Sequence, residues 1–359
     1  MHIKKKLNNL NFLYIIFFSL VLFINIIFST SLKANSFKIT DLEISEPFEL
    51  NFDKEKVIDK GFKTAFIELI SMITTSGDKQ KVINTPLDTI KRLIDSFTMG
   101  NESFVQNQYR VNFDVNFNKK NTLNFFEKKN IFPSIPQKKN ILLIPIFVDL
   151  KSDNIFLFSD NIFYKNWNIQ NERYFLLNYL LPNEDLEDVN LINQNSDSIE
   201  EYDFKKIIEK YDLQDFIITI IYSNDDELKI LSKIKLNNSL KIHNKRFNKI
   251  NLNNKDDLNI VLYELKNTYE NYWKSLNEIN TSMKISLNIQ IDAKENDKIK
   301  SFEEILGKID LISNYEIFKF NNYKIDYKII YFGTPDKFLN DMKEKGLLID
   351  SKKQIWTIE

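Results

Sequence analysis

The segment LPNEDLEDV, residues 181–189, holds the densest group of side chains that could perform chemistry. It carries four carboxylates, Glu184, Asp185, Glu187 and Asp188. Carboxylates so close together could act as the acid and base of a hydrolase or could bind a hard cation. The segment lacks the glycine and the regular oxygen spacing of a calcium loop. We interpret it as an exposed loop or a helix start and, together with Trp167, as the best candidate for a binding edge.

Other catalytic and cofactor motifs cannot be assembled from the sequence. The histidines are His2 and His243, and there is no cysteine, so a zinc site is not expected. His243 lies in the segment LKIHNKRFNKI, which we interpret as an exposed strand rather than as part of a Ser-His-Asp triad. The six glycines are scattered and form neither a phosphate loop nor a dinucleotide motif. We therefore predict no catalytic residue, no metal site and no cofactor.

Charge and aromatic spacing argue against a nucleic-acid partner. Without residues 1–34, which hold four of the 49 basic residues, the net charge is near −5. Nucleic-acid binders need clustered positive charge instead. Tyr327 and Tyr331 could stack on RNA bases as in RRM domains. Asp326 stands where an aromatic residue of that motif belongs, so we assign both tyrosines to a core.

Residues 1–34 have the order of a secretory signal peptide. Three lysines at 4–6 precede an apolar run at 12–28 and a short segment of small residues. We predict cleavage between Ala34 and Asn35 and a periplasmic or secreted protein. The alternative is an inner-membrane anchor formed by residues 12–28, which are at the lower limit of the length that spans a bilayer.

Hydrophobic periodicity predicts a mixed α/β fold of three consecutive small modules after the signal peptide. The first module, residues 35–130, contains a helix at 53–76 with one apolar stripe, a short helix that ends near Ile94, and a strand at 109–117 with one dry face. We expect Gly77 to end the first helix in a left-handed conformation. The short helix is expected to begin with an N-cap, a first-turn proline and a capping-box acid, namely Thr85, Pro86 and Asp88.

A proline-containing linker at 130–140 separates this module from the second, residues 140–278. The nearly continuous apolar run at 141–150 predicts a strand covered on both faces. The second module is predicted to end in a long helix at 256–276. Its other predicted elements are strands at 174–181, 215–223 and 227–236 and a helix at 202–211.

The third module, residues 279–359, is predicted to be a ferredoxin-like βαββαβ sandwich. Its GTPD turn follows an apolar strand and could hold a phosphate or begin a helix. We predict a helix start, because Gly333 precedes a natural N-cap in Thr334 and Pro335 suits the first helical position. An acid then occupies the position that a bound anion would take. We expect Trp356 to pack against the helix that follows.

The element order and several segments resemble a secreted Gram-negative family catalogued as domain of unknown function 2066. The resemblance rests on KGFKTAFIELISMITTSG, ILLIPIF, Trp167, LLPNEDLEDV, the GTPD turn, EKGLLID and QIWTI. These motifs are structural, and the family has no established activity. The resemblance therefore implies a compartment and a domain plan.

The favoured function is that of a non-enzymatic binding or accessory protein whose partner is another cell-envelope protein. The alternative is a cation-dependent or carboxylate-based hydrolase that uses the acids at 184–188. Contact with a membrane is expected only through the signal segment, if that segment is retained.

Overall fold

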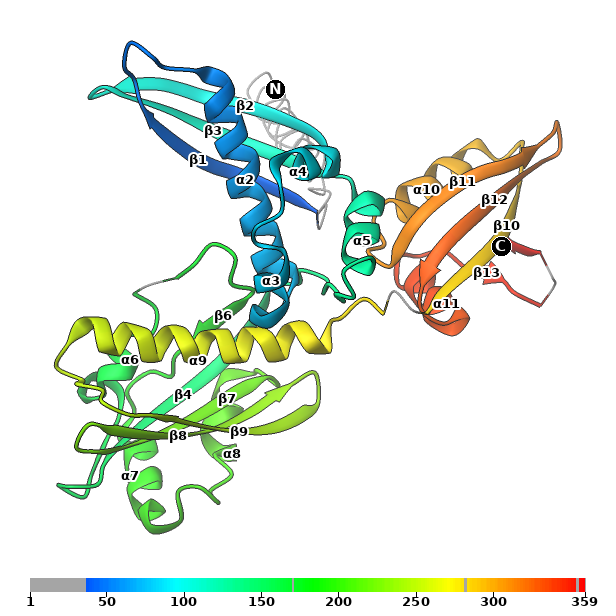
Figure 1. The fold of residues 1–359 in the computed structure, drawn as a ribbon. Helices are drawn as coiled ribbons and strands as arrows, with labels where there is room; N and C mark the ends of the chain where they lie inside the picture. The colour runs from blue at the N-terminus through cyan, green and yellow to red at the C-terminus, as the bar shows by residue number, and fades with distance from the viewer. Residues whose placement is uncertain (1–36, 170, 281–282, 353–354, 359) are drawn as a thin grey trace, which may run out of the picture. The chain divides into compact units, whose positions relative to one another are not determined.

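The computed structural model describes residues 37–169, 171–280, 283–352 and 355–358. The predicted signal peptide and its cleavage site lie outside these residues. The fold is mixed α/β, and the described residues form ten α-helices and 14 strands in three sheets (Figure 1). Within the described ranges no helix is both long and apolar enough to cross a membrane.

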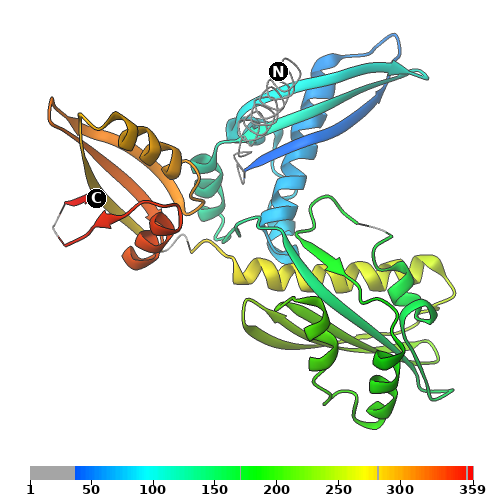
Figure 2. The same ribbon diagram turned by 180° about the vertical axis from the view of Figure 1, so that it is seen from behind.

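The first sheet is antiparallel and has the order β1-β3-β2, made by β1 (Lys38–Pro47), β3 (Gln108–Phe117) and β2 (Ile94–Val105). Helix α2 (Lys54–Ile73) runs along this sheet (Figures 1 and 2). Alternate residues of β3 are buried, which confirms the predicted strand with one dry face. A Cβ atom at Gly61 of α2 would lie 3.0 Å from the Phe113 ring, so glycine allows close approach of helix and sheet.

Two predicted helix ends in this region are wrong. Helix α2 ends at Ile73, and Thr75 then caps a separate helix, α3 (Ser76–Val82), so Gly77 lies inside a helix instead of terminating one. The N-cap of α4 (Leu87–Leu93) is Pro86 rather than Thr85. The hydroxyl of Thr85 donates to the carbonyl of Val82 at 2.6 Å and therefore serves the end of α3.

Strand β2 was not predicted. Its sequence, IDSFTMGNESFV, is mostly exposed, and few of its side chains reach the core. Without a buried alternate set, the period-two signal of a strand is absent. Helix α5 (Lys119–Glu127) follows β3 directly, with Asn118 as its N-cap.

The second sheet is built around β4 (Lys139–Asp149), which pairs in parallel with β7 (Phe216–Asn224) and with β6 (Leu177–Leu180). The remaining strands of this sheet are antiparallel: β5 (Asn154–Phe156), β8 (Glu227–Leu236) and β9 (Ser239–Phe247). Strand β4 contributes to a core on each of its faces, as its apolar run predicts.

Helices cover both faces of the second sheet (Figures 1 and 2). The long predicted helix is confirmed as α9 (Lys255–Leu276), which packs on one face. Three short helices also belong to this region: α6 (Ile162–Asn166), α7 (Leu186–Gln194) and α8 (Lys205–Ile208). Helices α7 and α8 share the core of the opposite face. The predicted helix at 202–211 is shorter than expected, being α8 and a 3-10 turn at Glu209–Tyr211.

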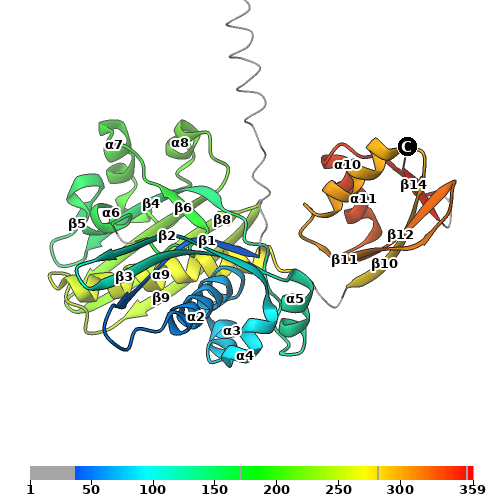
Figure 3. The ribbon, with the colours of Figure 1, turned by 90° about the horizontal axis from the view of Figure 1, so that it is seen from above.

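The third sheet has the order β11-β12-β10-β14-β13. Its strands are β10 (Lys284–Asp292), β11 (Ile312–Phe320), β12 (Lys324–Phe332), β13 (Ile349–Asp350) and β14 (Trp356–Ile358). Helices α10 (Asn296–Leu306) and α11 (Pro335–Glu344) lie on one face and share one core (Figure 3). Two short strands, β13 and β14, follow α11 where the prediction had one, so this region has one strand more than the predicted six elements. Strand β14 runs parallel to β10.

The GTPD turn begins helix α11, as predicted. The hydroxyl of Thr334 accepts a hydrogen bond from the amide of Lys337 at 3.2 Å, and Pro335 is the first helical residue. Gly333 has φ +155°, and a Cβ atom there would lie 2.7 Å from the Tyr331 ring. The ring centroids of Trp356 and Phe338 are 6.1 Å apart, which confirms the predicted packing.

The predicted linker has no helix or strand between Asn130 and Lys138, but it is held in place. The amide of Ser134 donates to the carbonyl of Ile73 at 2.6 Å. The amide of Ile279 donates to the carbonyl of Pro133 at 2.8 Å. Because Pro133 and Ser134 are buried as well, this segment is a packed connection rather than an exposed break.

Candidate functional site

The acidic segment forms the start of α7, in agreement with the predicted helix start. The Asp185 carboxylate is the N-cap and accepts a hydrogen bond from the amide of Glu187 at 2.8 Å. The ammonium group of Lys210 donates to Asp185 and to Asp188, each at 2.6 Å. Asp188 is fully buried, so one of the four acids is not available to a ligand.

Hydrogen bonds lower the pKa of two of these carboxyl groups, those of Glu184 and Asp185. The bond from Lys210 is the main reason why the pKa of Asp185 lies below its usual value. Hydrogen bonds from Ser159 lower the pKa of Glu184. A general acid at neutral pH needs the opposite, a raised carboxyl pKa. The segment is thus a charge-compensated helix cap, and its geometry does not resemble an acid–base pair.

Trp167 does not belong to an exposed edge. Its side chain is fully buried in the core under α9, where the ring lies 6.1 Å from Tyr269 and 5.5 Å from Tyr179, measured between centroids. The sequence pattern could not separate a Trp on a surface from one that fills a core. Trp167 is therefore a core residue and not a binding residue.

His243 lies on β9, as predicted, but it is half-buried rather than exposed. Burial and the nearby Lys241 and Lys245 lower the pKa of its imidazole. Its neighbour in the register on β8 is Ser232, whose hydroxyl is hydrogen-bonded to the hydroxyl of Tyr269 at 2.7 Å. A triad needs a carboxylate that orients the imidazole, and lysines flank it here.

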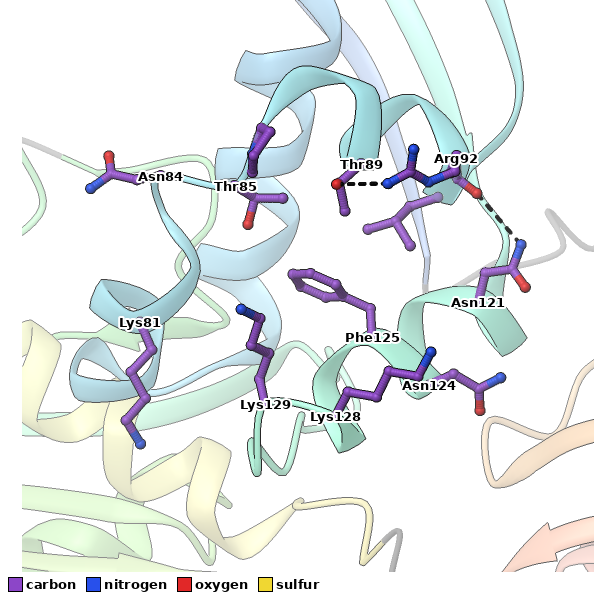
Figure 4. Close-up of a pocket in the computed structure, with 12 residues that line it drawn as sticks. Lys81, Asn84, Thr85, Thr89, Arg92, Asn121, Asn124, Phe125, Lys128 and Lys129 are labelled. Carbon is purple, nitrogen blue, oxygen red and sulfur yellow. Dashed lines mark hydrogen bonds between the residues drawn. The ribbon is translucent and has the colours of Figure 1, made fainter.

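The part of the chain that the structure describes contains no group of three or more His, Cys, Asp or Glu side chains that could hold a metal ion. A different feature of the first region has the shape of a binding site. It is a cavity of about 620 Å³ between α3, α4 and α5, which we call the basic cavity (Figure 4). Its lining residues are Lys81, Asn84, Thr85, Pro86, Thr89, Arg92, Leu93, Asn121, Asn124, Phe125, Lys128 and Lys129.

The wall of the basic cavity carries positive charge only. Four of its residues are cationic, Lys81, Arg92, Lys128 and Lys129, and none is acidic. Lys81 is paired with Asp78 at 2.6 Å, outside the cavity wall. The side chains of Lys128 and Lys129 have no hydrogen-bond or ion-pair partner in the described ranges.

Helix ends explain how the cations come together. Lys81 and Arg92 lie in the last turns of α3 and α4, and Lys128 and Lys129 follow the last turn of α5. Cations at these positions offset the negative end of a helix dipole, which accounts for their presence. The dipole does not account for the hollow between them or for a wall without acids.

The side chains of the basic cavity are held by local bonds. The guanidinium group of Arg92 donates to the hydroxyl of Thr89 at 2.9 Å, and the amide group of Asn121 donates to the carbonyl of Arg92 at 3.5 Å (Figure 4). Phe125 and Lys129 point from the α5 side toward Thr85 and Thr89. Lys81 points away from them.

No pattern in the sequence predicted this cavity. Its lysines and arginine are spread from 81 to 129, and the β2–β3 hairpin separates α4 from α5 in the chain. Only the return of the chain through β3 brings the two helices together. The available signal was the concentration of Lys and Asn with no acid at 118–124 and 128–130, which no motif spacing distinguishes.

No family model matches the chain, and no curated protein matches it. The resemblance to the secreted Gram-negative family therefore stays a prediction. What the protein does has to be inferred from its own residues.

Proposed function

We propose that the protein is a non-enzymatic binding or accessory protein of the cell envelope and that it holds its partner at the basic cavity. The observation that supports this most strongly is the wall of the cavity, with four cationic residues and no acid. Such a wall attracts an anionic group and has no carboxylate that could act on it as a general base. The proposed partner is another envelope protein.

The hydrolase alternative would use the acids at 184–188, and no contact of these residues favours it. Lys210 compensates Asp185 and Asp188, and the backbone of α7 uses Asp185 as a cap. A ligand of Asp185 would have to displace these bonds, and Asp188 is buried away from solvent.

The compartment rests on residues 1–34 alone. N-terminal sequencing of protein from the periplasm is expected to find Asn35 as the first residue. Protein that retains Met1 would contradict export by cleavage and would favour an inner-membrane anchor.

Crosslinking and affinity capture from envelope extracts test the proposed site. We expect a partner to be captured by the wild-type chain and by Lys120→Glu, and to be lost from the double variant Arg92→Glu/Lys129→Glu. Lys120 is exposed on α5, outside the cavity wall, so its reversal makes a charge change of the same kind at a neighbouring site. Equal capture by all three proteins would contradict a role for the basic cavity.

A further inference from the structure

We infer that the basic cavity binds an acidic peptide segment of the partner, with one apolar side chain on Phe125 and carboxylates at Arg92 and Lys129. This inference rests on the proposed function and adds the chemical class of the ligand. Four properties of the cavity wall support it: its size, its apolar floor, the position of its cations and the nature of its polar groups.

The volume of about 620 Å³ lies within the range of about 300–1,000 Å³ that ligand sites occupy. A single inorganic anion would fill only a small part of it, given that a water molecule takes about 30 Å³. The space therefore suits a ligand of several linked groups.

The floor of the cavity is apolar and fixed. The Phe125 ring packs at 6.1 Å from Phe66 and at 5.3 Å from Phe126, measured between centroids. These contacts hold one part of the ring in the core and leave the half-buried remainder at the cavity, next to Leu93. An apolar side chain of a ligand would gain contact there, whereas a small ion would not.

The cations lie where they could bind two carboxylates. Arg92 is oriented by Thr89, and Lys129, which follows α5, points toward Thr85 (Figure 4). Arg92 offers the forked donors that carboxylates prefer, and Lys129 a mobile point charge. Neither residue has an acidic partner in the described ranges that a ligand would have to displace.

The polar groups of the wall suit a peptide better than a phosphate. Asn121 and Asn124 carry both a donor and an acceptor, as a peptide bond does, while a phosphate needs donors. The Asn124 side chain has no hydrogen-bond partner in the part of the chain that is described. Phosphate cradles use the amides of helix N-termini, but the cations here lie at the C-terminal ends of α3, α4 and α5.

Fluorescence anisotropy with defined peptides tests the inference on the purified full chain. The probe is a capped, labelled Glu-Asp-Leu-Asp-Glu peptide, and the controls replace Leu by Ala or all acids by Lys. We expect Arg92→Glu/Lys129→Glu to weaken binding of the acidic Leu peptide at least tenfold. Lys120→Glu should change it less than twofold, and the Ala peptide should bind several-fold more weakly to the wild type.

The competing ligands have distinct outcomes. Equal binding of the Leu and Ala peptides, with displacement by millimolar inorganic phosphate, would show a simple anion site and overturn the inference. Displacement by ADP at lower concentration than by the unlabelled peptide would overturn it in favour of a nucleotide. If no acidic peptide binds while cavity-dependent capture from envelope extracts persists, the inference is wrong and the proposed function stands.

Discussion

At the scale of single residues, Lys210 decides what the acidic segment can do. Its ammonium group bonds to the buried Asp188 and to the helix cap Asp185, so the acids serve the structure before any ligand. These bonds are also the main cause of the raised pKa of Lys210. The sequence showed the acids but gave no sign of this cation, because 22 residues separate Lys210 from Asp188.

Lys210→Met is expected to destabilise the protein, because it leaves a buried carboxylate without its cation. A buried charged group without a partner costs on the order of 1–3 kcal/mol or more. Thermal melting at neutral pH measures the loss, and Lys206→Met is the control because Lys206 is exposed and has no such contact. Equal melting of the two variants would show that Asp188 finds another partner or takes up a proton.

At the scale of elements, patterns with a buried alternate or periodic set were predictable from the sequence. Strand β3 and helix α9 are examples, since burial imposes a clear period on their residues. Strand β4 was predictable from its continuous apolar run, because both of its faces are covered. The edge strand β2 was not predictable, because little of it is buried. The predictions that Gly77 ends a helix and that Thr85 is an N-cap were wrong for a different reason. The hydroxyl of Thr74 donates to the carbonyl of Ile70 at the end of α2, and that of Thr85 donates to the carbonyl of Val82 at the end of α3.

The start of α11 allows a test of a predicted element. Thr334→Ala removes the acceptor for the amide of Lys337 and is expected to cost about 1 kcal/mol. Trp356→Ala should cost about 2 kcal/mol, less than the roughly 3–5 kcal/mol of a fully buried Trp, because Trp356 is only half-buried.

Thermal melting of the full chain checks both values. If Trp356→Ala melts like the wild type and instead loses capture of an envelope partner, the residue is a contact for that partner and not a packing residue of β14.

At the scale of the whole molecule, one half-buried lysine, Lys119, and one buried lysine, Lys274, tie distant segments together. The ammonium group of Lys119 on α5 donates to the carbonyl of Ile309 at 3.0 Å. That of Lys274 on α9 donates to the carbonyl of Ser71 on α2. Burial lowers the pKa of each of these lysines to about 8. Such contacts between segments were beyond the reach of sequence patterns, which report periods within a segment.

These pKa values predict that the free energy of unfolding rises with pH. The folded pKa of Lys119, about 8, is below the ordinary value of 10.5, so between these values the unfolded chain binds more protons. The stability that Lys119 contributes at high pH is lost as the pH falls from 10.5 through its folded pKa of about 8. Tyrosines with raised pKa, such as Tyr109 at about 12, act in the opposite sense above pH 10.

Urea unfolding between about pH 7.5 and 9.5 therefore measures how much these lysines contribute to the rise of the unfolding free energy with pH. Lys119→Met is expected to reduce the rise in unfolding free energy by on the order of 1–2 kcal/mol. The control is Lys120→Met at the exposed neighbour. An unchanged slope in Lys119→Met would mean that Lys119 is solvated in the folded protein.

The basic cavity is the central claim, and site-specific photo-crosslinking in the living cell tests it most directly. A photoreactive residue replaces Asn124 in the cavity wall or Glu187 at the acidic segment. We predict a covalent adduct with an envelope protein from position 124, which Arg92→Glu/Lys129→Glu abolishes, and none from position 187. An adduct from position 187 with none from position 124 would contradict the basic cavity as the binding site.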